Sequence, residues 1–100
     1  MKVNNKPAAV DTSGVDLSEN LFELAELLAR NSHRHWSKRR LSEGWRFGPA
    51  PDYAKKEHPD LVPYEDLPDS EKAYDRSAAI ETLRAIIALG YRIEKTGGDC

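Results

Sequence analysis

The strongest constraint on the fold of this chain is the stretch 15–43, which contains neither proline nor glycine and is followed by Gly44. Apolar side chains recur along it at the i, i+3, i+4 spacing of an amphipathic helix. These positions are Leu17, Leu21, Leu24 and Leu28, with Phe22, Ala25 and Ala29 widening the stripe toward Ser32 and Trp36. Glycine in the left-handed conformation commonly ends a helix. The pattern predicts one long helix over about 18–43.

Capping residues and charges agree with this helix. Asp16 and Glu19 have the spacing of a capping box, so the helix is expected to begin there or at Ser18. Acidic residues lie early and basic residues late, which complements the helix dipole, and Glu26 and Arg30 form a favourable i, i+4 pair. Upstream, the segment 10–15 places valines on both sides of a turn-forming cluster and is expected to cross the core surface in an extended form.

The second half of the chain predicts an irregular loop and a second helix. Two prolines interrupt 53–63, which is expected to pack through Tyr53, Leu61 and Val62, and 64–67 fits a single helical turn. Pro68 suits a helix start, and apolar spacing then predicts a helix over about 69–89, closed by Gly90. Its expected core face consists of Tyr74, Ser77, Ile80, Leu83 and Ile87, with Ile86 and Leu89 beside it.

The segments 45–47 and 91–93 each follow a helix-stopping glycine and have similar patterns, so we expect them to pair as a small ribbon. The predicted fold class is mainly α: two long antiparallel helices, an irregular loop, a short helical turn and at most a minimal two-stranded β ribbon. The expected organisation is a flexible arm over 1–9, a single domain over 10–95 and a flexible tail over 96–100.

Composition excludes several classes of function. The net charge of −2, with charges of both signs mixed, argues against a nucleic-acid binder and against attraction to an acidic membrane. No apolar run approaches the ~18 residues of a membrane span, and the first residues lack the apolar stretch of a signal peptide. Cys100 is the only cysteine, which excludes an intrachain disulfide and a cysteine metal site and fits a reducing, cytoplasmic compartment.

Six stretches together resemble a known family in their order and spacing. They are 7–13 (PAAVDTS), 28–36 (LARNSHRHW), 44–48 (GWRFG), 58–64 (HPDLVPY), 71–72 (EK) and 83–94 (LRAIIALGYRIE). This combination resembles the RyR domain, the repeat of ryanodine receptors, and the resemblance covers about 7–95. In the receptors the repeats occur as tandem pairs in the cytoplasmic assembly, away from the pore, and free-standing copies occur in prokaryotes. The resemblance implies a single free-standing copy of the prokaryotic kind, in which a homodimer could restore the paired arrangement.

Trp36 and Trp45 are the candidate ligand-binding residues, together with Arg39, Arg40 and Arg46. Two aromatic rings flanked by guanidinium groups could stack a base and bind phosphate oxygens. The resemblance adds to this interpretation, because paired repeats in the receptors can hold an adenine nucleotide near their aromatic residues. The alternative is that both tryptophans belong to the core and the arginines form a solvated helix end.

The charge distribution leaves two further alternatives open. The segment 30–46 carries six basic residues and one acidic residue, a net +5, whereas 52–81 carries nine acidic and four basic residues, a net −5. These segments could neutralise each other within the fold or across a dimer. The basic segment could instead bind an anion or an acidic partner.

No motif predicts catalysis, a cofactor or a metal. His33 and His35 point about 200° apart on a helix, and His58 has no neighbouring ligand spacing that would complete a zinc site. The basic residues before Ser42 match a phosphorylation pattern that arises often by chance. The sequence predicts a non-catalytic protein-interaction or scaffolding module, with self-association as a homodimer as one form of partner binding. The alternative is a sensor of an adenine nucleotide or related anion.

Overall fold

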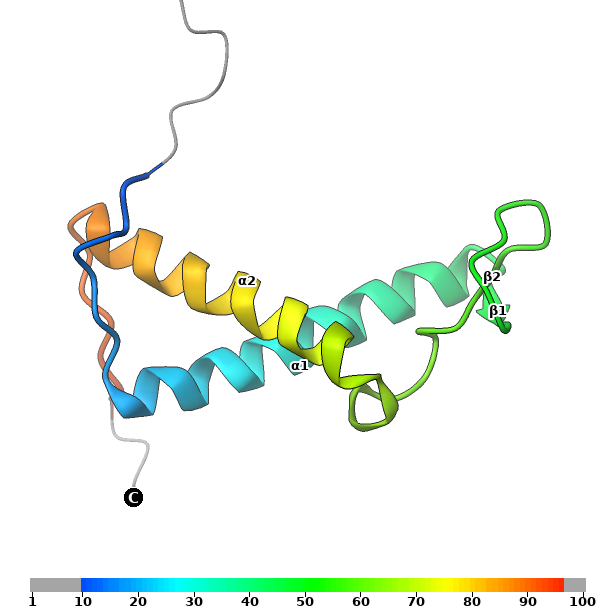
Figure 1. The fold of residues 1–100 in the computed structure, drawn as a ribbon, viewed down its shortest axis with the longest axis horizontal. Helices are drawn as coiled ribbons and strands as arrows, with labels where there is room; N and C mark the ends of the chain where they lie inside the picture. The colour runs from blue at the N-terminus through cyan, green and yellow to red at the C-terminus, as the bar shows by residue number, and fades with distance from the viewer. Residues whose placement is uncertain (1–9, 97–100) are drawn as a thin grey trace, which may run out of the picture.

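The computed structural model describes residues 10–96. In chain order the elements are α1 (Glu19–Ser42), β1 (Arg46–Phe47), β2 (Glu57–His58), the 3-10 helix η1 (Tyr64–Asp66) and α2 (Asp69–Ala88) (Figure 1). These elements confirm the predicted fold class and place both helices within a residue of their predicted bounds. The predicted arm over 1–9 lies outside the described residues, as does the predicted tail beyond residue 96.

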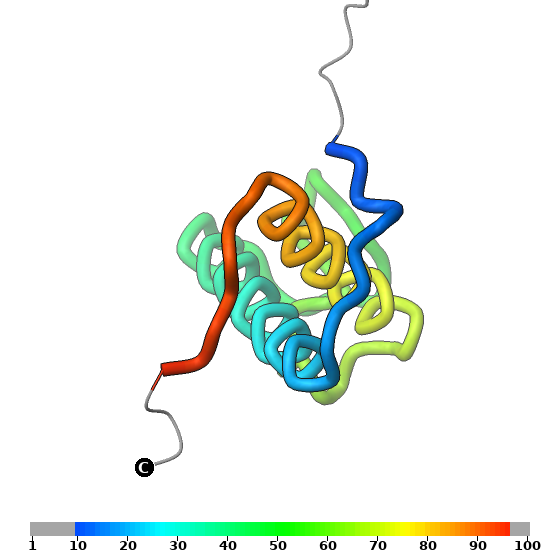
Figure 2. Tube along the Cα trace, turned by 90° about the vertical axis from the view of Figure 1, so that its left-hand side faces the viewer, coloured from blue at the N-terminus to red at the C-terminus, as the bar shows by residue number. Residues whose placement is uncertain are grey.

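The two helices run antiparallel: the first turns of α2 cross the middle of α1, and the helices spread apart toward the end of the molecule where α1 begins and α2 ends (Figure 1). The segments 10–18 and 91–96 close this end on opposite sides of the helix pair (Figure 2). Arg84 of α2 donates hydrogen bonds to the backbone carbonyls of Thr12 (2.8 Å) and Val15 (3.1 Å), and the Thr12 hydroxyl donates to Glu81 (2.7 Å). The predicted crossing of 10–15 is confirmed by these contacts, and the segment makes a turn at 13–14, where the N–H of Val15 donates to the carbonyl of Thr12.

Both long helices end as predicted, at glycines with positive φ: 92° for Gly44 and 99° for Gly90. After α1, the N–H of Trp45 donates to the carbonyl of Arg40 and the N–H of Gly44 donates to that of Leu41. The same pair of bonds follows α2. Both ends are therefore Schellman motifs, in which the chain reverses while the last carbonyls stay hydrogen-bonded.

Of the two predicted starts of α1, the capping box at Asp16 is wrong and the start at Ser18 is confirmed. Ser18 takes the N-cap position with an extended backbone, which makes Glu19 the first helical residue rather than the third. Asp16 consequently lies outside the helix, and the Ser18 hydroxyl bonds the Asn20 side chain (2.6 Å) instead of a backbone N–H.

The predicted ribbon is also wrong in its partner. β1 pairs in parallel with β2, with Arg46 opposite Glu57 and Phe47 opposite His58, and 91–93 forms no strand. The reason is directional. Because α1 and α2 are antiparallel, their C-terminal ends lie at opposite ends of the molecule, so the segments after Gly44 and Gly90 cannot meet.

The core is thin and centred on small residues of α1. Ala25 and Ala29 have no exposed surface, and Tyr64 and Leu67 pack closely on Ala29 because a methyl side chain allows near approach. Leu83 is the buried residue of α2, and Trp45 is buried after the first helix stop.

Several residues expected on the core faces of the helices are exposed: Phe22 by 47%, Tyr74 by 75%, Leu89 by 62%, and Ser77. Tyr53, through which the loop was expected to pack, is 77% exposed. Phe22 lies where the helices have spread apart (Figure 1). Near Tyr74, α2 presents Lys72, Asp75 and Arg76 as its half-buried side chains, so the tyrosine turns outward. No helix within 10–96 is long and apolar enough to cross a membrane.

Candidate functional site

A row of aromatic rings runs along the central face of α1. His33 is 7% exposed, and its ring Nε2 lies 2.7 Å from the carbonyl oxygen of Val62. The His33 ring stacks on Trp36, with centroids 5.7 Å apart and planes at 28°, and Trp36 meets His58 edge-on at 5.0 Å. The opposite neighbour of His33 is Tyr64, at 6.2 Å. Residues three apart share one face of a helix, which explains why His33 and Trp36 meet.

The structure brings three of the five predicted site residues together. The guanidinium carbon of Arg40 lies 4.8 Å from the centre of the Trp45 ring and 6.0 Å from that of Trp36. Tyr53 meets Trp45 edge-on at 5.3 Å, although Tyr53 is itself mostly exposed. The two interpretations therefore apply to different tryptophans. Trp45 is a core residue, whereas Trp36 is half-buried beside the guanidinium of Arg40 and remains a candidate binding residue.

Arg39 and Arg46 lie at the rim of this cluster and are paired with carboxylates. Arg39 pairs with Glu43 (3.2 Å) and Arg46 pairs with Glu57 across the β1–β2 ribbon (3.2 Å). Both arginine side chains are largely exposed. Of the five predicted residues, only Trp36 lines the α1 groove or the acidic pocket described below, and Trp36 lines the acidic pocket.

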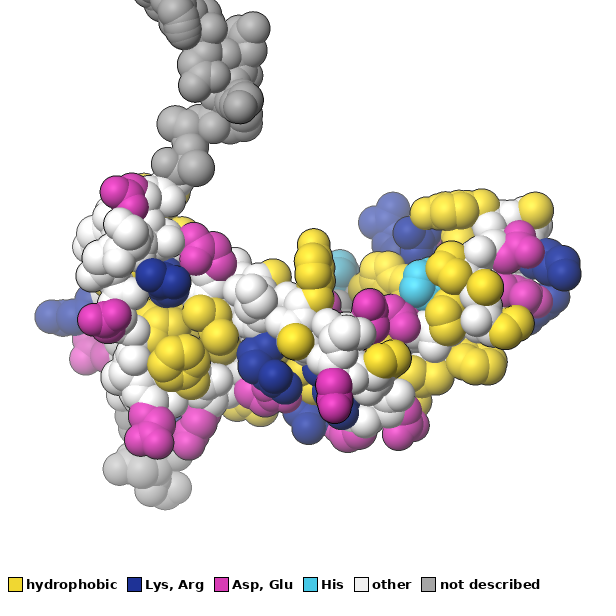
Figure 3. Space-filling model, in the orientation of Figure 1, with side chains coloured by type: hydrophobic (Ala, Val, Ile, Leu, Met, Phe, Trp, Pro, Cys, Tyr) yellow, Lys and Arg dark blue, Asp and Glu magenta, His cyan; other side chains and the backbone are white. Residues whose placement is uncertain are grey.

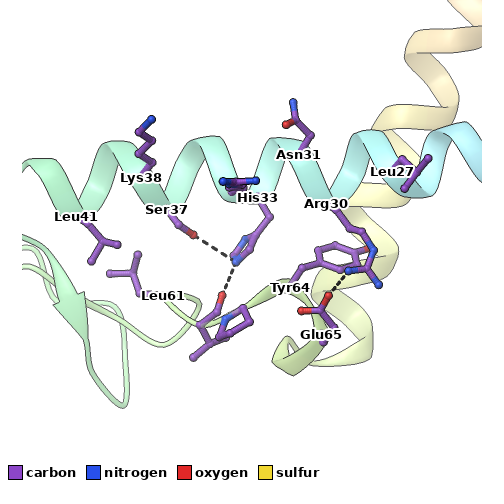
Figure 4. A pocket seen from close by; sticks show the side chains of 13 residues that line it. Leu27, Arg30, Asn31, His33, Ser37, Lys38, Leu41, Leu61, Tyr64 and Glu65 are labelled. Carbon is purple, nitrogen blue, oxygen red and sulfur yellow. Dashed lines mark hydrogen bonds and ion pairs between the residues drawn. The ribbon is translucent and has the colours of Figure 1, made fainter.

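A groove of about 790 Å³ lies between α1 and the segment 61–65 and is hereafter called the α1 groove. Its lining combines apolar and basic side chains: Leu27, Arg34, Lys38, Leu41, Leu61 and Val62. Figure 4 shows Leu41 and Leu61 pointing toward one another at one end, and Arg30 and Glu65 joined at the other. Lys38 belongs to the lining of the groove, but its side chain points away from the segment 61–65 and lies at the edge of the groove.

Ion pairs join the basic segment 30–46 to the acidic segment 52–81 within one chain, which confirms the prediction that the two segments partly neutralise each other within the fold. Arg30 pairs with Glu65 and lies 5.1 Å from the Tyr64 ring. The Glu65 carboxylate accepts its own backbone N–H and the Arg30 hydrogen bond, and both lower its pKa. The predicted Glu26–Arg30 pair is wrong, since Glu26 pairs instead with Arg76 of α2.

A second cavity of about 390 Å³, hereafter the acidic pocket, lies on the other side of His33. Its main lining residues are Trp36, His58, Asp60, Glu71, Tyr74 and Asp75. A shared hydrogen bond with Asp60 raises the pKa of Glu71. Burial raises the pKa of Asp75, with His33 opposing this rise and Asp60 adding to it. None of these three carboxylates forms an ion pair with a residue in 10–96.

Sequence reasoning missed both His33 and the acidic pocket. A signal for His33 was present, because it follows the buried Ala29 by four residues and precedes Trp36 by three. The carboxylates gave no local signal, since Asp60 lies in a loop and Glu71 and Asp75 lie on α2. In the described range 10–96, no group of three His, Cys, Asp or Glu side chains could hold a metal ion.

Comparison with protein families gives one match that spans nearly the whole chain. The family described as the RyR domain matches residues 5–95. All the elements from α1 to α2 and both cavities fall within this range.

Proposed function

Because this chain belongs to the RyR domain family, we propose that it is a non-catalytic protein-interaction module whose α1 groove binds an acidic, apolar segment of a partner protein. The compartment proposed is the cytoplasm, in keeping with a sequence that has a single cysteine. The observation that carries the proposal is the combination of exposed leucines and basic side chains along this groove.

The apolar part of the argument rests on Leu27 and Leu41, which are 61% and 59% exposed near the two ends of the groove. Fourteen residues of helix separate them by about 21 Å, a length that four turns of a partner helix would match. Half-buried Leu61 and Val62 continue the apolar surface between them. Exposed apolar patches of this kind mark interaction sites in soluble proteins.

The charge part rests on Arg34 and Lys38, which lie one helical turn apart and line the groove. Neither forms an ion pair with any residue in 10–96. Charge complementarity therefore favours an acidic partner over a basic one. Beyond the groove, hydrophobic side chains also gather over the β1–β2 end, where Phe47 and Tyr53 are exposed (Figure 3).

Fluorescence polarisation can test the proposal with two designed amphipathic helical peptides that share one leucine face, one carrying glutamates and the other lysines. We expect the acidic peptide to bind and the basic peptide not to bind. Lys38→Glu and Leu41→Ser should each weaken binding by about tenfold, since one lost contact of this kind is worth about 1.4 kcal/mol.

Matched controls lie outside the groove: Lys55→Glu repeats the charge reversal and Leu89→Ser repeats the loss of an exposed leucine. These controls should leave the affinity unchanged. Equal binding of both peptides, or equal weakening by the control variants, would contradict the proposal. A concentration-dependent dimer that Leu41→Ser weakens would identify a second copy of this chain as the occupant.

The second candidate function is the sensing of an adenine nucleotide or related anion. It is favoured by the contact of Arg40 with both Trp36 and Trp45. A ligand bound only by the folded state would stabilise it by about 2.7 kcal/mol at a hundredfold excess over Kd. Thermal unfolding with a nucleotide panel tests this directly. A shift that Trp36→Ala abolishes supports sensing, and the lack of any shift would exclude it.

A further inference from the structure

We propose that the acidic pocket binds a guanidinium group, presented as the arginine side chain of a partner protein. The inference does not depend on the proposed use of the α1 groove, because the two cavities share only His33 among their lining residues.

The lining of the pocket combines aromatic and acidic side chains. Trp36 of α1 and Tyr74 of α2 supply ring surfaces, and Tyr74 is 75% exposed although it borders a cavity. Asp60 from the loop after β2 and Glu71 and Asp75 from α2 supply the carboxylates. A cation bound here could lie against a ring face while carboxylates accept its hydrogen bonds.

His33 adds an independent indication that the pocket takes a hydrogen-bond donor. Its Nε2 lies 2.7 Å from the carbonyl oxygen of Val62, and because a carbonyl only accepts, this nitrogen must donate. In the neutral ring, Nδ1 is therefore an acceptor. No group in 10–96 hydrogen-bonds this Nδ1, although the side chain is more than nine-tenths buried and its ring lines the pocket.

The Nδ1 of His58 accepts the backbone N–H of Asp60 (3.0 Å) and so has its own partner. The three carboxylates around the pocket are acceptors that repel one another. The pKa of Glu71 is raised chiefly by its hydrogen bond with Asp60, which agrees with this crowding, whereas burial is the main cause of the raised pKa of Asp75. A donor-rich cation would relieve the crowding.

Guanidinium fits this arrangement better than an ammonium ion. It is planar, carries five N–H donors in a fixed fork and stacks on aromatic faces, whereas ammonium is a compact and strongly hydrated point charge. The cavity of about 390 Å³ is large enough for a flat group with its alkyl stem. The carboxylates belong to no cluster in the described chain that could hold a metal.

The test titrates the 15N-labelled intact chain with three capped amino acids: N-acetyl-arginine amide, its lysine equivalent and its citrulline equivalent, which has the shape of arginine without the charge. We expect the arginine compound to shift the indole N–H signal of Trp36 in a saturable manner. The lysine compound should bind at least fivefold more weakly, and the citrulline compound should not bind. Equal shifts with lysine or citrulline would overturn the proposal, as would no shift with arginine.

Variants locate the site. Glu71→Gln with Asp75→Asn should weaken arginine binding at least tenfold, whereas Glu23→Gln, an exposed acid on the outer part of α1, should not. Removing the crowded carboxylates should not reduce thermal stability, which separates lost binding from lost folding. A double variant that stays folded and binds arginine normally would overturn the assignment.

A short arginine-containing peptide distinguishes the two sources of guanidinium. Tighter binding of the peptide than of the capped amino acid supports a partner's side chain. Equal affinity would overturn that part of the proposal and identify a free small molecule as the ligand.

Discussion

Replacing Gly44 by alanine should lower the free energy of unfolding by about 1–2 kcal/mol, through the backbone alone. Its φ of 92° lies in a region where a Cβ atom costs roughly this amount in L-residues. The added methyl group would not collide with a neighbour, because the nearest side-chain atoms, Cδ and Nζ of Lys56, lie at 4.0 Å. For a domain of this size, the unfolding midpoint should fall by roughly 5–15 °C.

Thermal and urea unfolding followed by circular dichroism can measure this loss. Gly44→Asn should cost less than alanine, because asparagine tolerates positive φ better. Gly90→Ala should cost about the same, since its φ is 99° and no atom lies within 4 Å of the added Cβ. D-alanine at position 44 should instead stabilise by about 0.4–1 kcal/mol, because it accepts this φ and restricts the unfolded chain. If L-alanine were neutral, or D-alanine equally destabilising, the reasoning would be refuted.

Three further changes test other parts of the structure. Gly48→Ala should lower the free energy of unfolding by about 2–3 kcal/mol in the same assay, because the added Cβ would lie 2.4 Å from the Cβ of Glu57 and force β1 away from β2. A neutral result would contradict this close approach. Asp75→Asn should raise the unfolding midpoint at pH 7. The pKa of Asp75 is raised in the folded state, so the stability of the protein falls as the pH rises and this carboxyl ionises. The gain should vanish near pH 3, and a gain independent of pH would argue against this cause. The Glu26–Arg76 pair should show a coupling of about 0.2–1 kcal/mol in a double-mutant cycle at pH 7. Because the Arg76 hydrogen bond lowers the pKa of Glu26, this coupling should be lost as pH falls through the lowered pKa, and a coupling that persists at pH 2 would be inconsistent with an ion pair.

Local rules predicted the helices of this fold well. The bounds of α1 and α2 follow from apolar spacing and from Gly44 and Gly90, since a Schellman motif depends only on residues within one turn of the helix end. The strand that pairs with β1 could not be predicted from such local rules. Pairing of β1 with β2 depends on the loop between them, and the sequence pattern of 91–93 carries no information about which end of the molecule it reaches.

In the candidate site, too, the contacts set by local sequence could be predicted and those set by the packing of the helices could not. The contact among Trp36, Arg40 and Trp45 follows from helical spacing and the helix stop, so it could be anticipated from the sequence. The acidic pocket could not, because Asp60 and Asp75 meet only through the crossing of α2 over the centre of α1.

The most direct measurement of the central claim is an NMR map of the surface that the acidic amphipathic peptide contacts on the 15N-labelled chain. We predict that shifted amides will lie on α1 between Leu27 and Leu41 and in the segment 61–65, the two walls of the α1 groove. Amides near the exposed Leu89 and Tyr91, at the far end of α2, should not shift. Shifts confined to that far end, or no shifts at a peptide concentration that saturates binding, would contradict the account.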